Sequence, residues 1–200
     1  SRQLAPQQQS GEGKEGLPEG AGLRTSPIVI VEYGIESCYD VTLKRINRGH
    51  DFETARRAVQ MTAERGIDVG AHFILGLPGE DVEEVNYTIE EVKKLNPDSL
   101  TVHSLAIKRA SKLAQWIQTH DISCINNTDE TMTIAVNGAK AMDMLPYYLY
   151  RQKNMSGNFE NVGYAREGKF GIYNILIMEE LQTIVALGAG SITKRVCGDG

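Results

Sequence analysis

Residues 28–36 read Ile28-Val29-Ile30-Val31-Glu32-Tyr33-Gly34-Ile35-Glu36, a β-branched run that predicts a buried strand. Two further apolar runs follow, Ile67-Asp68-Val69-Gly70-Ala71-His72-Phe73-Ile74-Leu75 and Ser99-Leu100-Thr101-Val102-His103-Ser104-Leu105. A helical pattern comes after each run. Alternation of strand and helix predicts an α/β fold with a parallel sheet and right-handed crossovers.

The helices expected between these strands carry start and stop signals. Asp51 is expected to cap a helix that ends near Gly66, because glycine suits the left-handed position after a helix. Apolar residues recur at helical spacing over residues 82–95. Asp40 is expected to cap a short helix, and a polar helix is expected over about residues 108–118.

Residues 121–200 break this rhythm and predict an α+β region. Thr128 is expected to cap a helix, and residues 146–150 are expected to form a strand. The stretch 154–171 is rich in Gly and Asn and is expected to be a loop. Residues 173–187 are apolar, and their pattern leaves both helix and strand open.

The chain divides into three parts by composition. Residues 1–27 are rich in Gln, Gly, Glu, Ser and Pro without apolar periodicity, so a disordered tail is expected. Residues 28–120 hold three strand–helix units, which are too few to close a (β/α) barrel. We therefore expect a partial barrel, whose open edges need strands from another chain or from a missing N-terminal half.

Composition excludes several classes of protein. Hydrophobic residues make up 41% and charged residues 24% of the 200 residues, which is typical of a globular domain. The net charge of -5 argues against a nucleic-acid partner, and no apolar run is long enough for a membrane span. The cysteines predict neither a disulfide framework nor a metal cluster, and a cytoplasmic location is expected; they are Cys38, Cys124 and Cys197.

The polar residues of the three strands are expected on one face of the sheet. Strand alternation groups Glu36, His72 and His103 on that face, opposite the apolar residues that covering helices bury. Because ligands of parallel sheets bind at the carboxyl ends of the strands, these residues predict a pocket rim. The alternative is a set of isolated polar residues on a partly solvated sheet. No zinc site, phosphate loop or nucleophile triad is indicated.

Several longer strings resemble a known family. The front of the chain resembles the later barrel half of radical S-adenosylmethionine (radical SAM) enzymes, in Glu32–Asp40, Leu43–His50 and Ala71–Glu80. From Leu95 onward the sequence resembles the anaerobic coproporphyrinogen III dehydrogenase group in its HemZ-like form. That second resemblance rests on the strings Leu95–Ala110, Tyr147–Asn154, Gly157–Tyr164 and Tyr173–Glu180.

The resemblance implies a partial (β/α) barrel that binds S-adenosylmethionine and a [4Fe–4S] cluster. It also implies an oxidoreductase of porphyrin (heme) biosynthesis that acts on a tetrapyrrole-type substrate. The family ligates its cluster with a C-x3-C-x2-C loop, which the three cysteines of this chain do not supply. The chain is therefore expected to be inactive alone and to need a complementary N-terminal barrel half.

The resemblance also assigns cofactor-binding residues. Glu36 falls where relatives often place a Gln near the methionine moiety or ribose, and Arg48 matches the arginine that meets the S-adenosylmethionine carboxylate. His72 falls where relatives carry an Asp toward the ribose, and Gly76 begins the turn near the adenine. No catalytic residue and no metal ligand is predicted. The alternative is a non-catalytic heme- or tetrapyrrole-binding or assembly module, in which the aromatic and basic string 147–153 stacks on the ligand.

Overall fold

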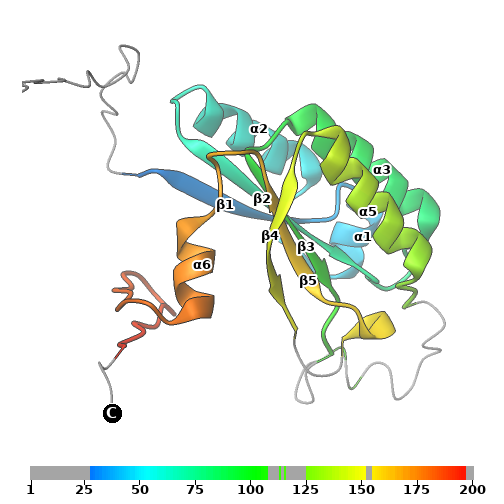
Figure 1. Cartoon of the computed structure of the whole chain (residues 1–200). Coiled ribbons are helices and arrows are strands. Elements are labelled where there is room, and N and C mark those ends of the chain that lie inside the picture. The colour runs from blue at the N-terminus through cyan, green and yellow to red at the C-terminus, as the bar shows by residue number, and fades with distance from the viewer. Residues whose placement is uncertain (1–27, 108–112, 114, 116–124, 152–154, 197–200) are drawn as a thin grey trace, which may run out of the picture.

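The computed structural model describes residues 28–107, 113, 115, 125–151 and 155–196 (Figure 1). The expected tail at 1–27 and nearly all of the expected helix at 108–118 lie outside these residues. One five-stranded sheet runs through the described part of the chain, in the order β1-β2-β3-β5-β4. The fold is thus mixed α/β, with an open sheet that matches the expected partial barrel.

The parallel half of the sheet is confirmed. It consists of β1 (Ile30–Glu36), β2 (Asp68–Leu75) and β3 (Ser99–Ser104), which pair in parallel in this order. Gly34 lies opposite His72, and His72 lies opposite Thr101. The three strands therefore bring their polar residues into neighbouring rows.

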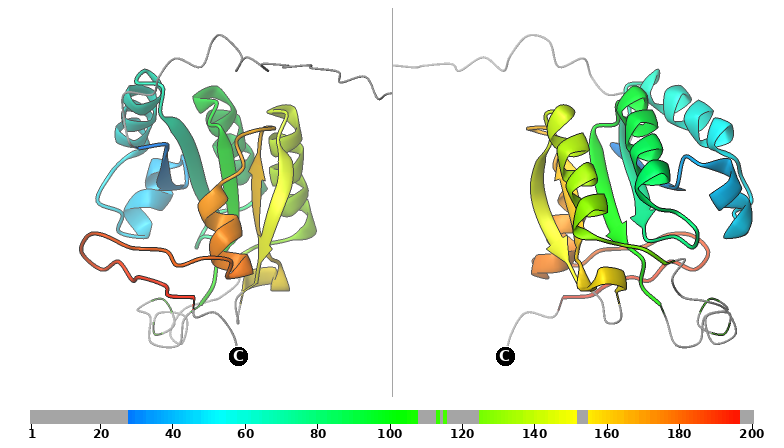
Figure 2. Two further views of the ribbon diagram at one scale, coloured as in Figure 1. Left: turned by 60° about the vertical axis from the view of Figure 1, so that its left-hand side comes forward. Right: turned by 90° about the vertical axis from the view of Figure 1, so that its right-hand side faces the viewer.

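Helices cover one face of this sheet. Figure 2 shows the four helices of this layer on the same side. They are α1 (Asp40–Arg45), α2 (Phe52–Ala63), α3 (Val82–Leu95) and α5 (Asp129–Ala141). Helix α6 (Ile172–Glu179) lies on the opposite face, where it crosses the sheet (Figure 2). That second face is otherwise free of helices in the part of the chain that the structure describes.

Two of the three predicted helix caps are confirmed. The Asp51 carboxylate accepts a hydrogen bond from the Thr54 N–H, and the Thr128 hydroxyl accepts one from Thr131. The prediction for Asp40 was wrong, since Asp40 is the first residue inside α1 and makes no cap there. Its carboxylate instead accepts the backbone N–H of Phe52 at 2.8 Å, so it satisfies a free donor at the start of α2.

The largest correction concerns the expected loop at 154–171. It contains the short 3-10 helix η2 (Ser156–Asn158) and the strand β5 (Asn161–Ala165). All five residues of β5 are buried. This strand pairs antiparallel with both β3 and β4 (Leu145–Tyr150), and β4 itself is confirmed. Hydrogen bonds along both edges stabilise a strand that its own composition does not favour.

The hydrophobic core lies between the sheet and the outer helices. Alternation holds as predicted, because Ala71, Phe73 and Leu75 of β2 are buried beneath the helices. Leu100 and Val102 of β3 pack in the same layer. Among the described helices, none combines the length and the hydropathy that crossing a bilayer requires.

Candidate functional site

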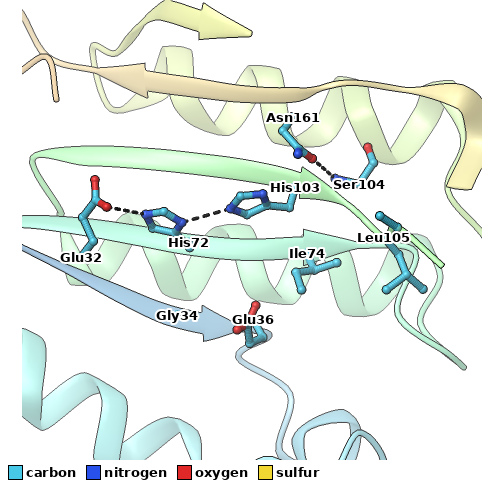
Figure 3. Close-up of a pocket in the computed structure, with 10 residues that line it drawn as sticks. Glu32, Gly34, Glu36, His72, Ile74, His103, Ser104, Leu105 and Asn161 are labelled. Carbon is cyan, nitrogen blue, oxygen red and sulfur yellow. Dashed lines mark hydrogen bonds and ion pairs between the residues drawn. The ribbon is translucent and has the colours of Figure 1, made fainter. Parts of the chain in front are cut away.

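A cavity of about 450 Å³ opens on the face of the sheet that the outer helices leave uncovered. Figure 3 shows its wall, formed by the ends of β1, β2 and β3 and by β5. Its lining comprises Glu32, Gly34, Glu36, His72, Ile74, His103, Ser104, Leu105, Ala106 and Asn161. The structure thus brings Glu36, His72 and His103 to one pocket, as strand alternation predicted.

Two histidines on adjacent strands face each other in this wall. His72 Nδ1 of β2 lies 3.0 Å from His103 Nε2 of β3 (Figure 3), and the two rings are stacked. The other ring nitrogen of His72, Nε2, lies 3.6 Å from Glu32 Oε2. Asn174 of α6 donates to the second oxygen of Glu32 at 3.3 Å. A polar network therefore runs across β1, β2 and β3 and reaches α6 through Asn174.

The electrostatics of this network follow from burial and from its own charges. Burial lowers the pKa of His103 from 6.5 to about 4, and electrostatic repulsion from the neighbouring His72 ring acts in the same direction. The hydrogen-bonding influence of His72 holds the pKa of Glu32 below its ordinary value of 4.5, although burial opposes this effect. At neutral pH the wall therefore contains an uncharged His103 and an ionised Glu32.

Glu36 and Arg48 form an ion pair beside the cavity. A β-bulge interrupts β1 between Gly34 and Glu36, and Glu36 has a left-handed φ of 65°. Arg48 donates to the Glu36 carboxylate and, at 3.0 Å, to the Gly34 carbonyl. A Cβ at residue 34 would lie 3.0 Å from the Arg48 guanidinium, so glycine leaves room for this contact.

The structure places Gly76 away from the cavity lining. Gly76 has a φ of 80°, and a Cβ there would lie 3.0 Å from the Asn127 side chain and 3.1 Å from the Ser156 hydroxyl. The turn after β2 is thus packed against the segments that precede α5 and begin η2. Of the four residues assigned to cofactor binding, Glu36 and His72 line the cavity, and Arg48 reaches it through Glu36.

The described residues fit one of the two implied cofactors. Carboxylates suit the hydroxyl and ammonium groups of S-adenosylmethionine, and a guanidinium suits its carboxylate. No group of three or more His, Cys, Asp or Glu residues in the described ranges could hold a metal. Cys38 is buried at 2% exposure, and burial strongly raises the pKa of its thiol. That environment does not suit a cluster ligand, which must be a thiolate.

Sequence reasoning missed two features of the site. Asn161 was assigned to a loop, yet it lines the cavity from β5 and accepts the Ser104 N–H at 3.0 Å. Ser104 and Ala106 extend the wall at the end of β3. A weak signal was present, because Val162 and Tyr164 are apolar residues two positions apart, as in a strand with one buried face.

Comparison with known proteins shows which family the sequence resembles. Residues 21–92 match the Radical SAM superfamily. This segment belongs to that superfamily. Over 165 residues the chain is 41% identical to the oxygen-independent coproporphyrinogen-III oxidase-like protein HemZ of Bacillus subtilis, a match that covers 82% of this chain and 33% of HemZ. The resemblance to the HemZ-like group is therefore confirmed.

Two further comparisons extend this result. Protein YhcC of Escherichia coli is 38% identical over 105 residues, which cover 52% of this chain and 34% of YhcC. The chain thus spans about a third of the length of these curated relatives. The solved structure of coproporphyrinogen III oxidase (HemN) from Escherichia coli, described as a radical SAM enzyme, aligns with a TM-score of 0.54. At 17% identity, over 78% of this chain and 33% of HemN, this likeness shows the radical SAM fold alone.

Proposed function

We propose that this chain is the later part of a radical SAM oxidoreductase that acts on a tetrapyrrole-type substrate, as a coproporphyrinogen III dehydrogenase does. The observation that carries the proposal is the cavity at the carboxyl ends of three parallel strands, where a binding site is expected in such a sheet. The 41% identity to HemZ supports the same reaction class. A reducing cytoplasm is the compartment proposed, because iron–sulfur chemistry needs thiolate ligands.

In this proposal the cavity binds S-adenosylmethionine. Arg48 pairs with the ligand carboxylate through guanidinium donors that Glu36 and Gly34 leave free. The Glu36 carboxylate accepts from the ligand's ammonium or hydroxyl groups, and His72 lies beside the ribose. Gly76 lies outside the cavity lining, so its turn is proposed to border the adenine only where the ligand extends beyond the cavity. When bound beside a reduced cluster, this cofactor would provide the radical that abstracts a hydrogen atom from the substrate.

The chain's own residues orient the ligand and shield it from water. The ion pair between Glu36 and Arg48 holds both side chains before the ligand arrives, which lowers the entropy lost on binding. The apolar side chains of Ile74 and Leu105 exclude water from one part of the cavity.

Ligand binding to the full chain tests the cavity. We expect S-adenosylmethionine to bind, and Arg48→Ala to weaken the affinity by roughly 10-fold or more, since a charge-assisted hydrogen bond contributes about 1.5–3 kcal/mol. Arg56→Ala is the matched control, because Arg56 pairs with Glu53 on the exposed face of α2. Isothermal titration calorimetry measures both. Equal loss of affinity in the two variants would contradict the proposed site.

Catalysis is proposed to require a cluster-binding segment that the 200 residues do not contain, because their cysteines are too widely spaced for C-x3-C-x2-C. We expect the chain, reconstituted anaerobically with iron and sulfide, to show neither the visible absorbance of a cluster nor release of 5′-deoxyadenosine. Mixing it with a polypeptide that carries the missing barrel strands should restore both signals. A strong signal from the chain alone would refute the proposal of inactivity.

A second candidate is a non-catalytic module that binds heme or another tetrapyrrole. The observation in its favour is the aromatic cluster in which Tyr147 stacks on Phe170 and contacts Tyr148 edge to face. Rings of this kind stack on planar ligands. Titration with heme and with S-adenosylmethionine separates the candidates. Tight heme binding without S-adenosylmethionine binding favours the module.

A further inference from the structure

The chain leaves β1 through a strained turn beside the cavity. Glu36 has a φ of 65°, and the Ser37 N–H donates to the Ile35 carbonyl at 2.8 Å. This bond closes a γ-turn whose central residue has a positive φ, which is the rare and strained form of the turn. Non-glycine residues seldom adopt such a φ. Strain of this kind persists only where the surrounding structure holds it, and it concentrates at functional sites.

Ser37 holds this turn from outside the cavity. Its hydroxyl donates to Glu80 Oε1 at 2.5 Å and accepts the Tyr39 N–H at 3.0 Å. Ser37 is 0% exposed and Glu80 is 4% exposed, so water does not compete for these contacts. Ser37 is absent from the cavity lining. One buried hydroxyl therefore joins the turn at the end of β1 to the turn that follows β2.

The residues on either side of the turn are fixed as well. Ile35 is buried in the hydrophobic core at 1% exposure. The Cys38 N–H donates to Thr88 Oγ1 of α3 at 3.1 Å. The backbone N–H groups of residues 37–39 thus each have a defined acceptor. Glu36 cannot relax toward a strand conformation without breaking one of these buried contacts, and an unpaired buried donor is costly.

The turn directs Glu36 toward Arg48. The Glu36 side chain is 16% exposed, lines the cavity and accepts from the Arg48 guanidinium. Arg48 is the more exposed partner at 37%, and its second contact is the Gly34 carbonyl at 3.0 Å. A long arginine side chain loses much rotamer freedom when it is held in one place. The order of Arg48 therefore depends on where the turn places the Glu36 carboxylate.

We propose that Ser37 is a positioning residue of the cavity: by holding the γ-turn at Glu36, it fixes the Glu36 carboxylate and, through it, the Arg48 guanidinium. This inference deepens the proposed function, on which it rests only for the statement that Arg48 meets the carboxylate of the ligand. A guanidinium that is already held loses less entropy when the ligand binds.

Nuclear magnetic resonance of the full chain without ligand tests the positioning. A positive φ at Glu36 gives a strong nuclear Overhauser effect between the amide and α protons of that residue. The order parameter of the Arg48 Nε–H group reports how firmly the guanidinium is held. We expect the unmodified chain to show the strong effect and an ordered Arg48. Ser37→Ala should weaken the first signal and lower the second.

Tyr33→Phe is the matched control. It removes another hydroxyl contact of β1, the one between Tyr33 and Thr62 Oγ1 at 2.6 Å, and it leaves the turn and the cavity lining intact. Both signals should be unchanged in this variant. The inference is overturned if Ser37→Ala keeps both signals, or if Tyr33→Phe loses them to the same extent. Ser37→Cys has nearly the same volume and a weakly donating thiol, so it replaces Ser37→Ala if that variant does not fold.

Binding of S-adenosylmethionine, measured by calorimetry, gives a second readout. We expect Ser37→Ala to weaken the affinity by roughly 2- to 10-fold, the cost of immobilising one long side chain on binding, and Tyr33→Phe to leave it unchanged. Equal affinities of Ser37→Ala and the unmodified chain would overturn the positioning role. If the unmodified chain binds no S-adenosylmethionine, the proposed function fails, and the two signals measured without ligand still decide whether Ser37 positions Arg48.

Discussion

Gly163 of β5 lies beneath the ring of Tyr148 on β4, and a Cβ at residue 163 would lie 1.9 Å from that ring. Thr101 of β3 is paired with Gly163 from the other side. The Tyr148 hydroxyl reaches across the glycine to Thr101 Oγ1 at 3.2 Å. One glycine thus lets a side chain of the edge strand contact the parallel half of the sheet.

Adding a methyl group at this point should destabilise the fold. We expect Gly163→Ala to lower the free energy of unfolding by about 1–3 kcal/mol, because the Tyr148 ring must move from a well-packed position. Gly49→Ala is the matched control, since a Cβ at residue 49 meets nothing within 4 Å. Urea denaturation measures both variants. An equally small loss in both would show that the contact between strands does not stabilise the sheet.

Glu80 should make stability fall as the pH rises. Glu80 is 4% exposed and accepts the Ser37 hydroxyl at 2.5 Å, and burial raises its pKa above the ordinary 4.5. The folded state then holds its proton more tightly than the unfolded state does. The stabilisation is complete below the ordinary pKa and is lost as the pH rises through the folded pKa. In Glu80→Gln this loss should be absent. Glu167→Gln, at an exposed position, should behave as the unmodified chain, and urea curves across this pH range compare the three proteins.

His103 should act in the opposite direction. Its pKa is about 4 in the folded state against 6.5 for an ordinary histidine, so the unfolded state binds a proton more readily. Stability should fall as the pH drops from about 6.5 to about 4, by on the order of 3 kcal/mol for the full shift. His103→Gln should remove this dependence, and His50→Gln should retain it. Urea denaturation at a series of pH values measures the slope, and parallel slopes in both variants would contradict the assignment.

Cys38 should be unreactive in the folded chain. Its thiol is 2% exposed, and burial beside acidic groups strongly raises its pKa, so little thiolate forms. In a variant with Cys124 and Cys197 replaced by Ser, we expect no labelling by iodoacetamide at pH 7.5 until denaturant is added. Rapid labelling without denaturant would contradict this prediction and show that a reactive thiolate forms at Cys38.

The candidate site was predictable from the sequence wherever strand alternation acts locally. Glu36, His72 and His103 share a face because each lies on a strand whose opposite face is continuously apolar. Asn161 was not predictable in this way, because its short strand contains a glycine and follows a segment rich in Gly and Asn. That strand forms because β3 and β4 supply hydrogen bonds on both of its edges.

Local patterning alone determined the three parallel strands, the helices α2, α3 and α5, and the apolar face that buries residues such as Phe73 and Val102. The sequence resemblance alone also indicated the radical SAM superfamily. Tertiary structure decided which residues meet across strands. Asp40 accepts the first N–H of α2 instead of capping its own helix, Asn161 joins the pocket, and Glu32 approaches His72. These contacts join residues distant in the sequence, so they depend on how strands pair in space, which no local pattern of residues encodes.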